Sequence, residues 1–79
     1  MEESYTKDGI QFNISSSAEE TEQHQWTPRF MVIEILTGII STRTLVEQIF
    51  ATQSEAETCA HYAARQWIDN GRPGLDVKP

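Results

Sequence analysis

The residues of this 79-residue chain best suited to hold a metal ion are one cysteine, Cys59, and two histidines, His24 and His61. Cys59 and His61 lie two positions apart in a segment with helical periodicity, so their side chains point in different directions. No C-x-x-C or H-E-x-x-H spacing occurs in the sequence. We therefore expect no metal site and no cofactor, with Cys59 as a small core residue and His61 on the solvent side.

The sequence also contains few candidate residues for nucleophilic or acid–base catalysis. Several serines fall in the 15–25 segment or at the expected helix start, where their hydroxyls bond to local backbone, and no G-x-S-x-G occurs. Glu34 and Glu47 are the carboxylates that a sheet could bring together, but a cross-strand ion pair of Glu34 with Arg29 or Arg43 explains Glu34 better. The glycines form no phosphate-binding pattern. The sequence therefore predicts no catalytic residues, no enzyme activity and no small-molecule substrate.

The net charge is −6 and is unevenly distributed. Three acidic residues, Glu19, Glu20 and Glu22, lie in the segment SSSAEETEQHQ, residues 15–25. Nucleic-acid binding depends on cationic neutralisation of phosphates, so this charge argues against DNA, RNA or an anionic membrane as partners. The acidic segment is interpreted as a solvated connection between strands. A frayed helical turn and a recognition loop for a basic protein partner are the alternatives.

The clearest element is a C-terminal helix. The S-x-x-E motif at residues 54–57 is a capping box, and apolar residues then recur at spacings of three and four up to Trp67. The N-G pair at residues 70–71 suits a left-handed C-terminal cap, and Pro73 prevents continuation of the helix. The pattern predicts a helix over residues 55–69 whose buried stripe is rich in alanine.

The segments before this helix are expected to be strands. The run I-Q-F-N-I at residues 10–14 alternates apolar and polar side chains, and RFMVIEIL at residues 29–36 is rich in β-branched and aromatic types. The segment 39–50 also has apolar residues at a helical spacing, but its β-branched start favours a strand. We therefore expect an α+β fold of order β-β-β-α, a three-stranded antiparallel β-meander with one C-terminal helix packed on one face.

The middle strand offers two possible faces to the helix. We place its odd-numbered positions, 31–35, toward the helix, which leaves Phe30 and Val32 on the opposite face near Trp26. An apolar sheet face with an aromatic rim in a small acidic domain is typical of a protein–protein contact. The sequence thus predicts an interface of Trp26, Phe30 and Val32, used in a homodimer or with another protein. The alternative is that the C-terminal tail or the loop before Trp26 covers this face.

The chain is expected to form one domain, residues 1–79, with an ordered core of about 8–71 and mobile segments at 1–7, 15–25 and 72–79. One cysteine permits no internal disulfide and favours a reducing compartment. The N-terminus has no basic segment followed by an apolar run, and the run FMVIEIL is too short to span a bilayer. We therefore expect a soluble cytoplasmic protein.

The segment FATQSEAETCAHYAARQWID, residues 50–69, resembles the closing unit of small uncharacterised bacterial proteins. In those proteins an aromatic strand end is followed by T-x-x-E-A and an alanine-spaced helix that ends in W-I-D. With the upstream strands, the outline over residues 8–70 is similar to the partial double-stranded-RNA-binding-like fold of HicB-type antitoxins, although their Pro-Gly strand connection does not occur here. The resemblance implies the β-β-β-α fold. It also suggests the alternative function of an antitoxin-like regulator that binds a basic partner through residues 15–25.

Overall fold

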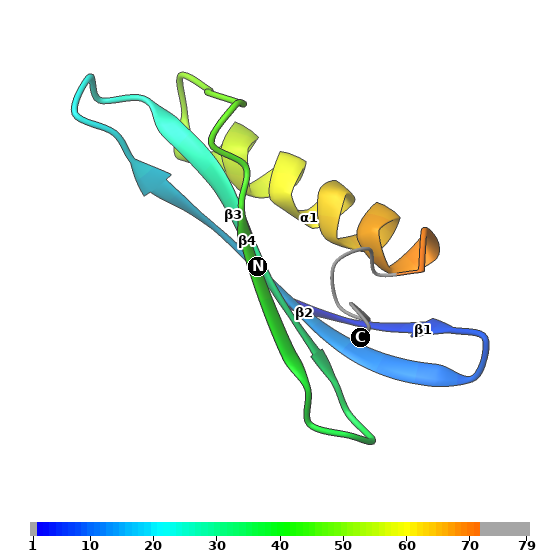
Figure 1. The fold of residues 1–79 in the computed structure, drawn as a ribbon. Helices are drawn as coiled ribbons and strands as arrows, with labels where there is room; N and C mark the ends of the chain where they lie inside the picture. The colour runs from blue at the N-terminus through cyan, green and yellow to red at the C-terminus, as the bar shows by residue number, and fades with distance from the viewer. Residues whose placement is uncertain (1, 72–79) are drawn as a thin grey trace.

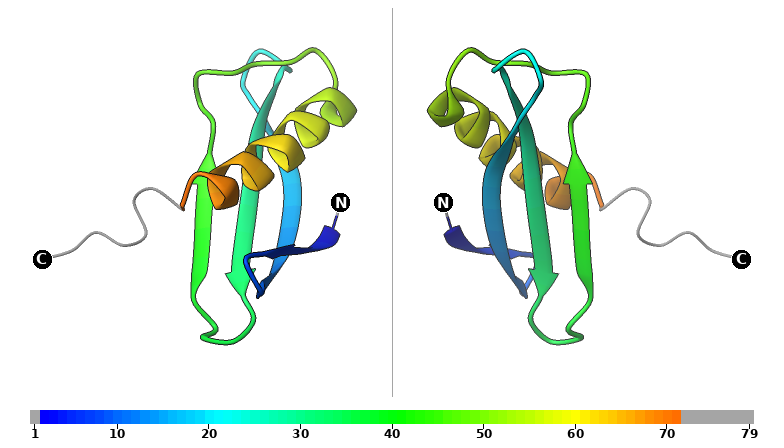
Figure 2. Two further views of the ribbon diagram at one scale, coloured as in Figure 1. Left: turned by 90° about the vertical axis from the view of Figure 1, so that its right-hand side faces the viewer. Right: turned by 90° about the vertical axis from the view of Figure 1, so that its left-hand side faces the viewer.

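The computed structural model describes residues 2–71, which form a four-stranded antiparallel sheet and one C-terminal helix. Strands β1 (Glu2–Lys7), β2 (Ile10–Glu20), β3 (Trp26–Glu34) and β4 (Ile40–Thr44) lie side by side in chain order. Helix α1 (Gln53–Asp69) crosses one face of the sheet diagonally (Figure 1, Figure 2). The α+β class, the antiparallel meander and the C-terminal helix are as expected, whereas the number of strands is four and not three.

The additional strand is β1, in a region that the sequence placed outside the ordered core. It pairs with β2 along its whole length, from Glu2 opposite Ser15 to Lys7 opposite Ile10. Asp8 and Gly9 form the two-residue turn between them, and both have positive φ values, 53° and 79°. Such a turn matches the right-handed twist of the two strands that it joins. Residues 2–7 therefore form a paired strand, where the sequence predicts a mobile segment.

The acidic segment 15–25 is also more regular than expected. Its first part continues β2 as far as Glu20, which pairs with Trp26 at the start of β3. Only residues 21–25 form the connection, where the Thr21 hydroxyl accepts hydrogen bonds from the Gln23 and Gln25 amides at 3.3 and 3.2 Å. The loop interpretation is correct for 21–25 and wrong for 15–20, because the serines, although polar, occupy regular strand positions there.

The expected orientation of β3 is wrong, and this error affects the predicted interface. Phe30 and Val32 are both buried against α1, whereas the side chains of Met31 and Ile33 lie on the opposite face. The rings of Phe30 and Trp67 lie 6.0 Å apart between centroids. An alanine stripe on the helix leaves space for large side chains from the sheet, so the aromatic face of β3 turns toward it. The core is completed by other buried residues of β2 and α1: Phe12, Ile14, Ala60, Ala64 and Ile68.

The ambiguous segment 39–50 divides into a strand and an irregular part. Residues 40–44 form β4, as predicted, and the chain then leaves the sheet until Phe50 makes an isolated bridge with Trp26. The helix starts two residues earlier than expected because Thr52 is its N-cap and accepts a hydrogen bond from the Glu55 amide at 3.2 Å. Residues 72–79, expected to be mobile, lie outside the described residues. Within residues 2–71, no helix is long and apolar enough to cross a membrane.

Candidate functional site

Among the described residues, no helix or strand covers the face of the sheet opposite α1, and its centre carries no charged side chain. The strand registers place the following residues at the centre of this face: Ser4, Asn13, Ser15, Ser17, Met31, Ile33, Ile40 and Thr42. A shallow hollow runs over part of it, and Ser4 donates a hydrogen bond to Asn13 at 3.2 Å across β1 and β2. The right-hand view of Figure 2 shows the sheet in front of the helix. The charged residues of this face, among them Glu2 and Arg29, lie toward its margins, so this acidic protein can approach another protein at the centre without bringing carboxylates together.

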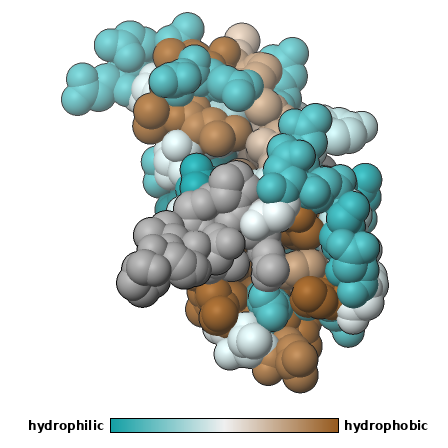
Figure 3. Space-filling view, turned by 45° about the vertical axis from the view of Figure 1, so that its right-hand side comes forward, coloured by the Kyte–Doolittle hydropathy of each residue, from teal (hydrophilic) through white to brown (hydrophobic). Residues whose placement is uncertain are grey.

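One end of the sheet is strongly apolar. Ile35, Leu36, Ile39 and Ile40 belong to the β3–β4 hairpin and are between 44% and 89% exposed. We call these four residues the hairpin patch. Figure 3 shows hydrophobic side chains at the end of the molecule that this hairpin forms. A cluster of large apolar side chains in water is unusual in an isolated domain and marks a contact surface.

Strand β4 borders the sheet, and its hydrogen bonds to β3 show which of its backbone groups are free to bond elsewhere. The Glu34 amide donates to the Ile39 carbonyl at 2.9 Å, and the Leu45 amide donates to the Pro28 carbonyl at 2.8 Å. Both pairs are directly opposed in the register of this hairpin. They therefore mark positions where the two strands exchange hydrogen bonds, and such positions recur at every second residue of an antiparallel pair.

Between these two marks, Ser41 and Arg43 direct their amides and carbonyls toward β3. Ile40, Thr42 and Thr44 direct theirs to the other side, away from the sheet. In the part of the chain that the structure describes, no strand lies on that side of β4. The outer side of β4 therefore presents an alternating row of donors and acceptors to any strand that can approach it.

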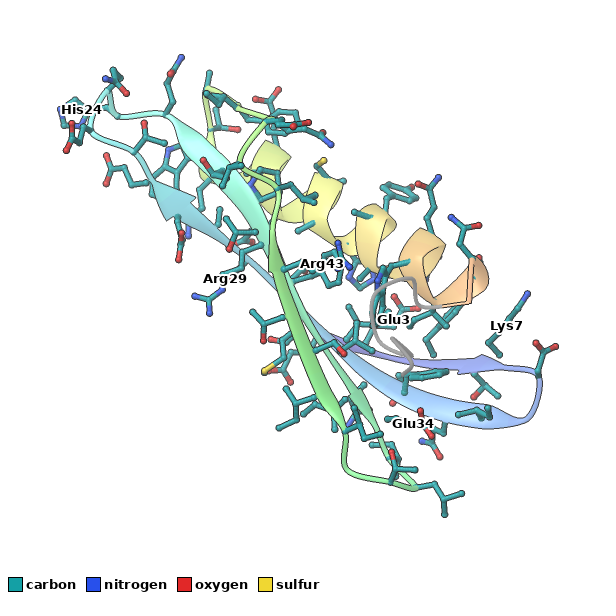
Figure 4. All side chains as sticks on the ribbon, in the orientation of Figure 1. Glu3, Lys7, His24, Arg29, Glu34 and Arg43 are labelled. Carbon is teal, nitrogen blue, oxygen red and sulfur yellow. The ribbon has the colours of Figure 1, made fainter. Side chains whose placement is uncertain are left out.

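Strand β1 borders the other side of the sheet and is held to α1 by charged groups. The Glu3 carboxylate bonds to both the His61 imidazole and the Arg65 guanidinium. Tyr5 donates its hydroxyl hydrogen to Asp69 at 2.6 Å, and the Lys7 ammonium lies 3.9 Å from the same carboxylate. Figure 4 shows Glu3 and Lys7 on the helix side of β1. We call these contacts the β1–α1 ladder.

The ladder also shifts the titration of its members. The hydrogen bond from Arg65, followed by that from His61, holds the pKa of Glu3 below its ordinary value. The hydrogen bond to Glu3 raises the pKa of Arg65 in turn. Hydrogen bonding to Asp69 is the main cause that raises the pKa of Tyr5, with burial second. Each of these shifts favours the protonation state that keeps β1 attached to the helix.

The sequence did not reveal this ladder and placed His61 on the solvent side. The His61 side chain is only 13% exposed because it lies against Glu3. The sequence contained a signal for these contacts. Positions 3, 5 and 7 lie on one face of a strand, and positions 61, 65 and 69 lie on one face of a helix. The charged and hydrogen-bonding groups of the two sets are complementary. Cys59, predicted to be a core residue, is only partly buried, with its thiol 3.1 Å from the Gln48 side-chain carbonyl, and burial raises its pKa.

The predicted interface of Trp26, Phe30 and Val32 does not form one exposed surface in the structure. Phe30 and Val32 are core residues, so they cannot line the contact surface predicted for them. Trp26 is half-buried at the start of β3, where its amide and carbonyl bond to Phe50. The correction follows from the reversed orientation of β3: the apolar residues that reach the open face are Met31 and Ile33.

The acidic residues of segment 15–25 are partly engaged within the chain. Glu19 forms an ion pair with Arg29 at 3.2 Å across β2 and β3, and Glu20 lies 3.1 Å from the imidazole of His24. Glu22 is exposed in the 21–25 connection. Figure 4 shows His24 at the far end of this hairpin and Arg29 on the side of the sheet away from the helix. Binding of a basic partner through these acids stays a prediction.

Among residues 2–71, no group of three or more histidine, cysteine, aspartate or glutamate side chains could hold a metal ion. No protein-family model matches the chain, and comparisons with curated proteins and with solved structures find no match. The resemblance to small bacterial proteins and to HicB-type antitoxins therefore stays a prediction. The candidate site is thus defined by the geometry of this chain itself, by the open face, the hairpin patch and the outer side of β4.

Proposed function

We propose that this chain is a non-enzymatic protein–protein interaction module that forms a homodimer through the hairpin patch and the adjoining open face. The observation that carries this proposal is the exposure of four large aliphatic residues within one hairpin of a small acidic domain. Leaving such side chains in water costs about 25 cal/mol for each Å² that a contact could bury. The charged residues of the β1–α1 ladder, by contrast, attach β1 to α1 within the single chain.

A second copy is a suitable partner because the patch adjoins a neutral surface. Two copies of a chain with net charge −6 repel each other, so they should meet where carboxylates are few. The central positions of the open face and of β4 satisfy this condition, because serine, threonine, asparagine and aliphatic residues occupy them. Apolar area and low charge therefore coincide on one part of the surface.

Light scattering across a range of protein concentrations tests this proposal. The wild-type chain should show the mass of a dimer at high concentration and should dissociate on dilution. The double variant Leu36→Asp/Ile40→Asp should remain monomeric with an unchanged helical circular dichroism signal, because both side chains are exposed in the single chain. A matched control is Tyr62→Asp, which places a carboxylate at a 62% exposed position on the helix and should leave the dimer intact. A wild-type chain that stays monomeric at every concentration contradicts the proposal.

A further inference from the structure

We propose that two copies of this chain join edge to edge, with β4 of one copy antiparallel to β4 of the other about a two-fold axis at Thr42. This inference rests on the proposed homodimer and places its contact at β4, the edge at which the hairpin patch adjoins the open face. The outward amides and carbonyls of Ile40, Thr42 and Thr44 would bond to those of the second copy. The two sheets would thereby continue into one, with both helices on the same face.

The side chains of β4 leave its outer side accessible to a second strand. Native edge strands are commonly protected against pairing by lysine, proline, a bulge or a covering segment. Strand β4 has the sequence ISTRT, in which neither proline nor lysine occurs, and its pairing with β3 is regular from Ile33–Ile40 to Arg29–Thr44. Its charged residue, Arg43, points to the helix side, where the guanidinium lies 5.8 Å from the centre of the Trp67 ring. The sequence and pairing of β4 therefore show neither lysine, proline nor a bulge, the devices by which an edge strand itself resists pairing.

The register follows from the direction of the free backbone groups. With the axis at Thr42, the two Thr42 residues exchange hydrogen bonds, and Ile40 of each copy exchanges hydrogen bonds with Thr44 of the other. Arg43 then lies opposite Ser41 of the second copy, so no like charges meet. Moving the axis to Arg43 would place two guanidinium groups directly opposite each other, which is destabilising. The register centred on Thr42 uses all the outward groups of the strand.

The exposed apolar residues at the two ends of β4 favour a second copy over an unrelated peptide. The hairpin patch lies at the start of β4, whereas Val46 and Ile49 follow its end and are 70% and 52% exposed. Figure 2 shows the hairpin and the segment after β4 at opposite ends of this strand. Antiparallel pairing brings the start of one strand beside the end of the other. The hairpin patch of each copy therefore lies beside Val46 and Ile49 of the other, and the two-fold axis produces this apolar contact twice.

A charge-reversal pair at Thr42 tests the position of the axis. Thr42 is exposed on the open face, so Thr42→Lys and Thr42→Glu should both fold. Each variant alone should be monomeric, because identical charges would face each other across the axis. An equimolar mixture should recover the dimer mass, with one copy of each variant in every dimer. Thr6→Lys and Thr6→Glu are the matched controls, since Thr6 is exposed on the same face but on β1, and they should leave the dimer mass unchanged.

Amide hydrogen exchange on the wild-type chain gives a second test that needs no substitution. The Ser41 and Arg43 amides, bonded to β3, should be protected at every concentration, whereas those of Thr42 and Thr44 should become protected only as the dimer forms. Fast exchange of Thr42 and Thr44 in a dimeric sample would overturn edge pairing. Edge pairing is also overturned if Thr42→Lys remains dimeric while Leu36→Asp/Ile40→Asp does not, and the homodimer itself would then stand. A wild-type monomer would overturn both proposals.

Discussion

The two edges of this sheet are built in opposite ways. Strand β1 directs Glu3, Tyr5 and Lys7 toward α1, where each finds a charged or hydrogen-bonding partner. Strand β4 carries small and β-branched side chains and one charged residue, Arg43, whose guanidinium lies 5.8 Å from the centre of the Trp67 ring. Charged side chains along β1 also make it a poor template for another strand, whereas the one charged residue of β4, Arg43, points to the helix side.

This difference suggests a division of tasks within a small domain. A chain of about this size buries only about 60% of the surface of its unfolded form, so its stability margin is narrow. The β1–α1 ladder adds long-range contacts that join the first strand to the last helix. The apolar residues that this small core cannot bury gather near β4, where a second copy could cover them. Strand β1 thus stabilises the single chain, and β4 forms the contact of the proposed dimer.

The largest effect should come from the core that supports both edges. Phe30→Ala removes a buried ring from between β3 and α1, and truncation of a buried phenylalanine typically costs about 3–5 kcal/mol. Urea unfolding should therefore show a much lower midpoint, and both edges should be lost in one transition. Met31→Ala, at the neighbouring position on the open face, is the control and should cost less than about 1 kcal/mol. Equal losses for the two variants would show that the orientation of β3 is wrong.

A smaller effect should distinguish the two sides of β4 itself. Ser41→Pro removes an amide that bonds to β3 and leaves the buried backbone of Val32 without its donor, at a cost of about 1–3 kcal/mol. Thr42→Pro removes an amide that points away from the sheet, a position where edge strands tolerate proline. Monomer stability should therefore fall clearly for Ser41→Pro and little for Thr42→Pro.

The dimer should respond differently to these two prolines. Thr42→Pro should abolish the dimer in light scattering at concentrations where the wild-type chain is dimeric, because the central hydrogen bonds of the edge pairing are lost. If Thr42→Pro destabilises the single chain as much as Ser41→Pro, the assignment of outward and inward amides in β4 is wrong. The contrast between β1 as an attached edge and β4 as an edge open to pairing would then be wrong.

Local patterns in the sequence were sufficient for the helix, because its signals lie within one or two turns. The alanine stripe and the cap at residues 70–71 predicted α1 closely. Its start was displaced because two overlapping motifs compete: S-x-x-E at 54–57 and T-x-x-E at 52–55. The structure uses the second, in which the Thr52 hydroxyl accepts from the Glu55 amide. Choosing between them requires the path of the chain before the helix, which no local pattern contains.

Strand β1 and the orientation of β3 could not be predicted in this way, because both depend on distant contacts. The inward residues of β1 are polar, so the strand lacks the apolar alternation that marks 10–14. The side chains that bond to its inward residue Glu3 lie in the helix at the other end of the chain. Both faces of β3 are apolar, and Glu34 was misleading because it lies at the end of the strand and is only partly buried. The hairpin patch was consequently missed as a contact surface.

The β1–α1 ladder should make stability depend on pH in the acid range. The pKa of Glu3 is lowered from 4.5 by Arg65 and His61, so the folded chain holds this proton less tightly than the unfolded chain. The stabilisation is therefore fully present above pH 4.5 and is lost as the pH falls through the lowered pKa. The wild-type chain should have a higher urea midpoint than Glu3→Gln near neutral pH, and this difference should close on acidification.

Glu2→Gln is the matched control for this measurement, because Glu2 neighbours Glu3 in β1 but lies on the open face. It removes the same charge without touching the ladder, so its midpoint should follow that of the wild-type chain across the pH range. A Glu3→Gln variant that tracks the wild-type chain at every pH would show that β1 does not need this carboxylate. Attachment of β1 would then depend on its backbone pairing with β2 and on the contacts of Tyr5 and Lys7 with Asp69.

The smallest effect should come from the hydroxyl of Tyr5. Tyr5→Phe removes the hydrogen bond to Asp69 but keeps a ring beneath the Arg65 guanidinium, which lies 5.6 Å from the ring centre. The pKa of Tyr5 is raised from 10.0, so its stabilisation is fully present below pH 10 and is lost as the pH rises through the raised value. The urea midpoint should drop slightly for Tyr5→Phe near neutral pH, and the difference should vanish in strong alkali.

The effect should be small because the bond between Tyr5 and Asp69 is exposed, where water competes for both partners. Tyr62→Phe removes a hydroxyl from an exposed position on the helix and is the control for alkaline titration in general. If Tyr5→Phe lowers the midpoint near neutral pH and not in strong alkali, the ladder extends from Glu3 to the end of α1, and β1 is fixed along its whole length. If it has no effect at any pH, attachment is confined to Glu3, and the far end of β1 relies on its turn at Asp8 and Gly9.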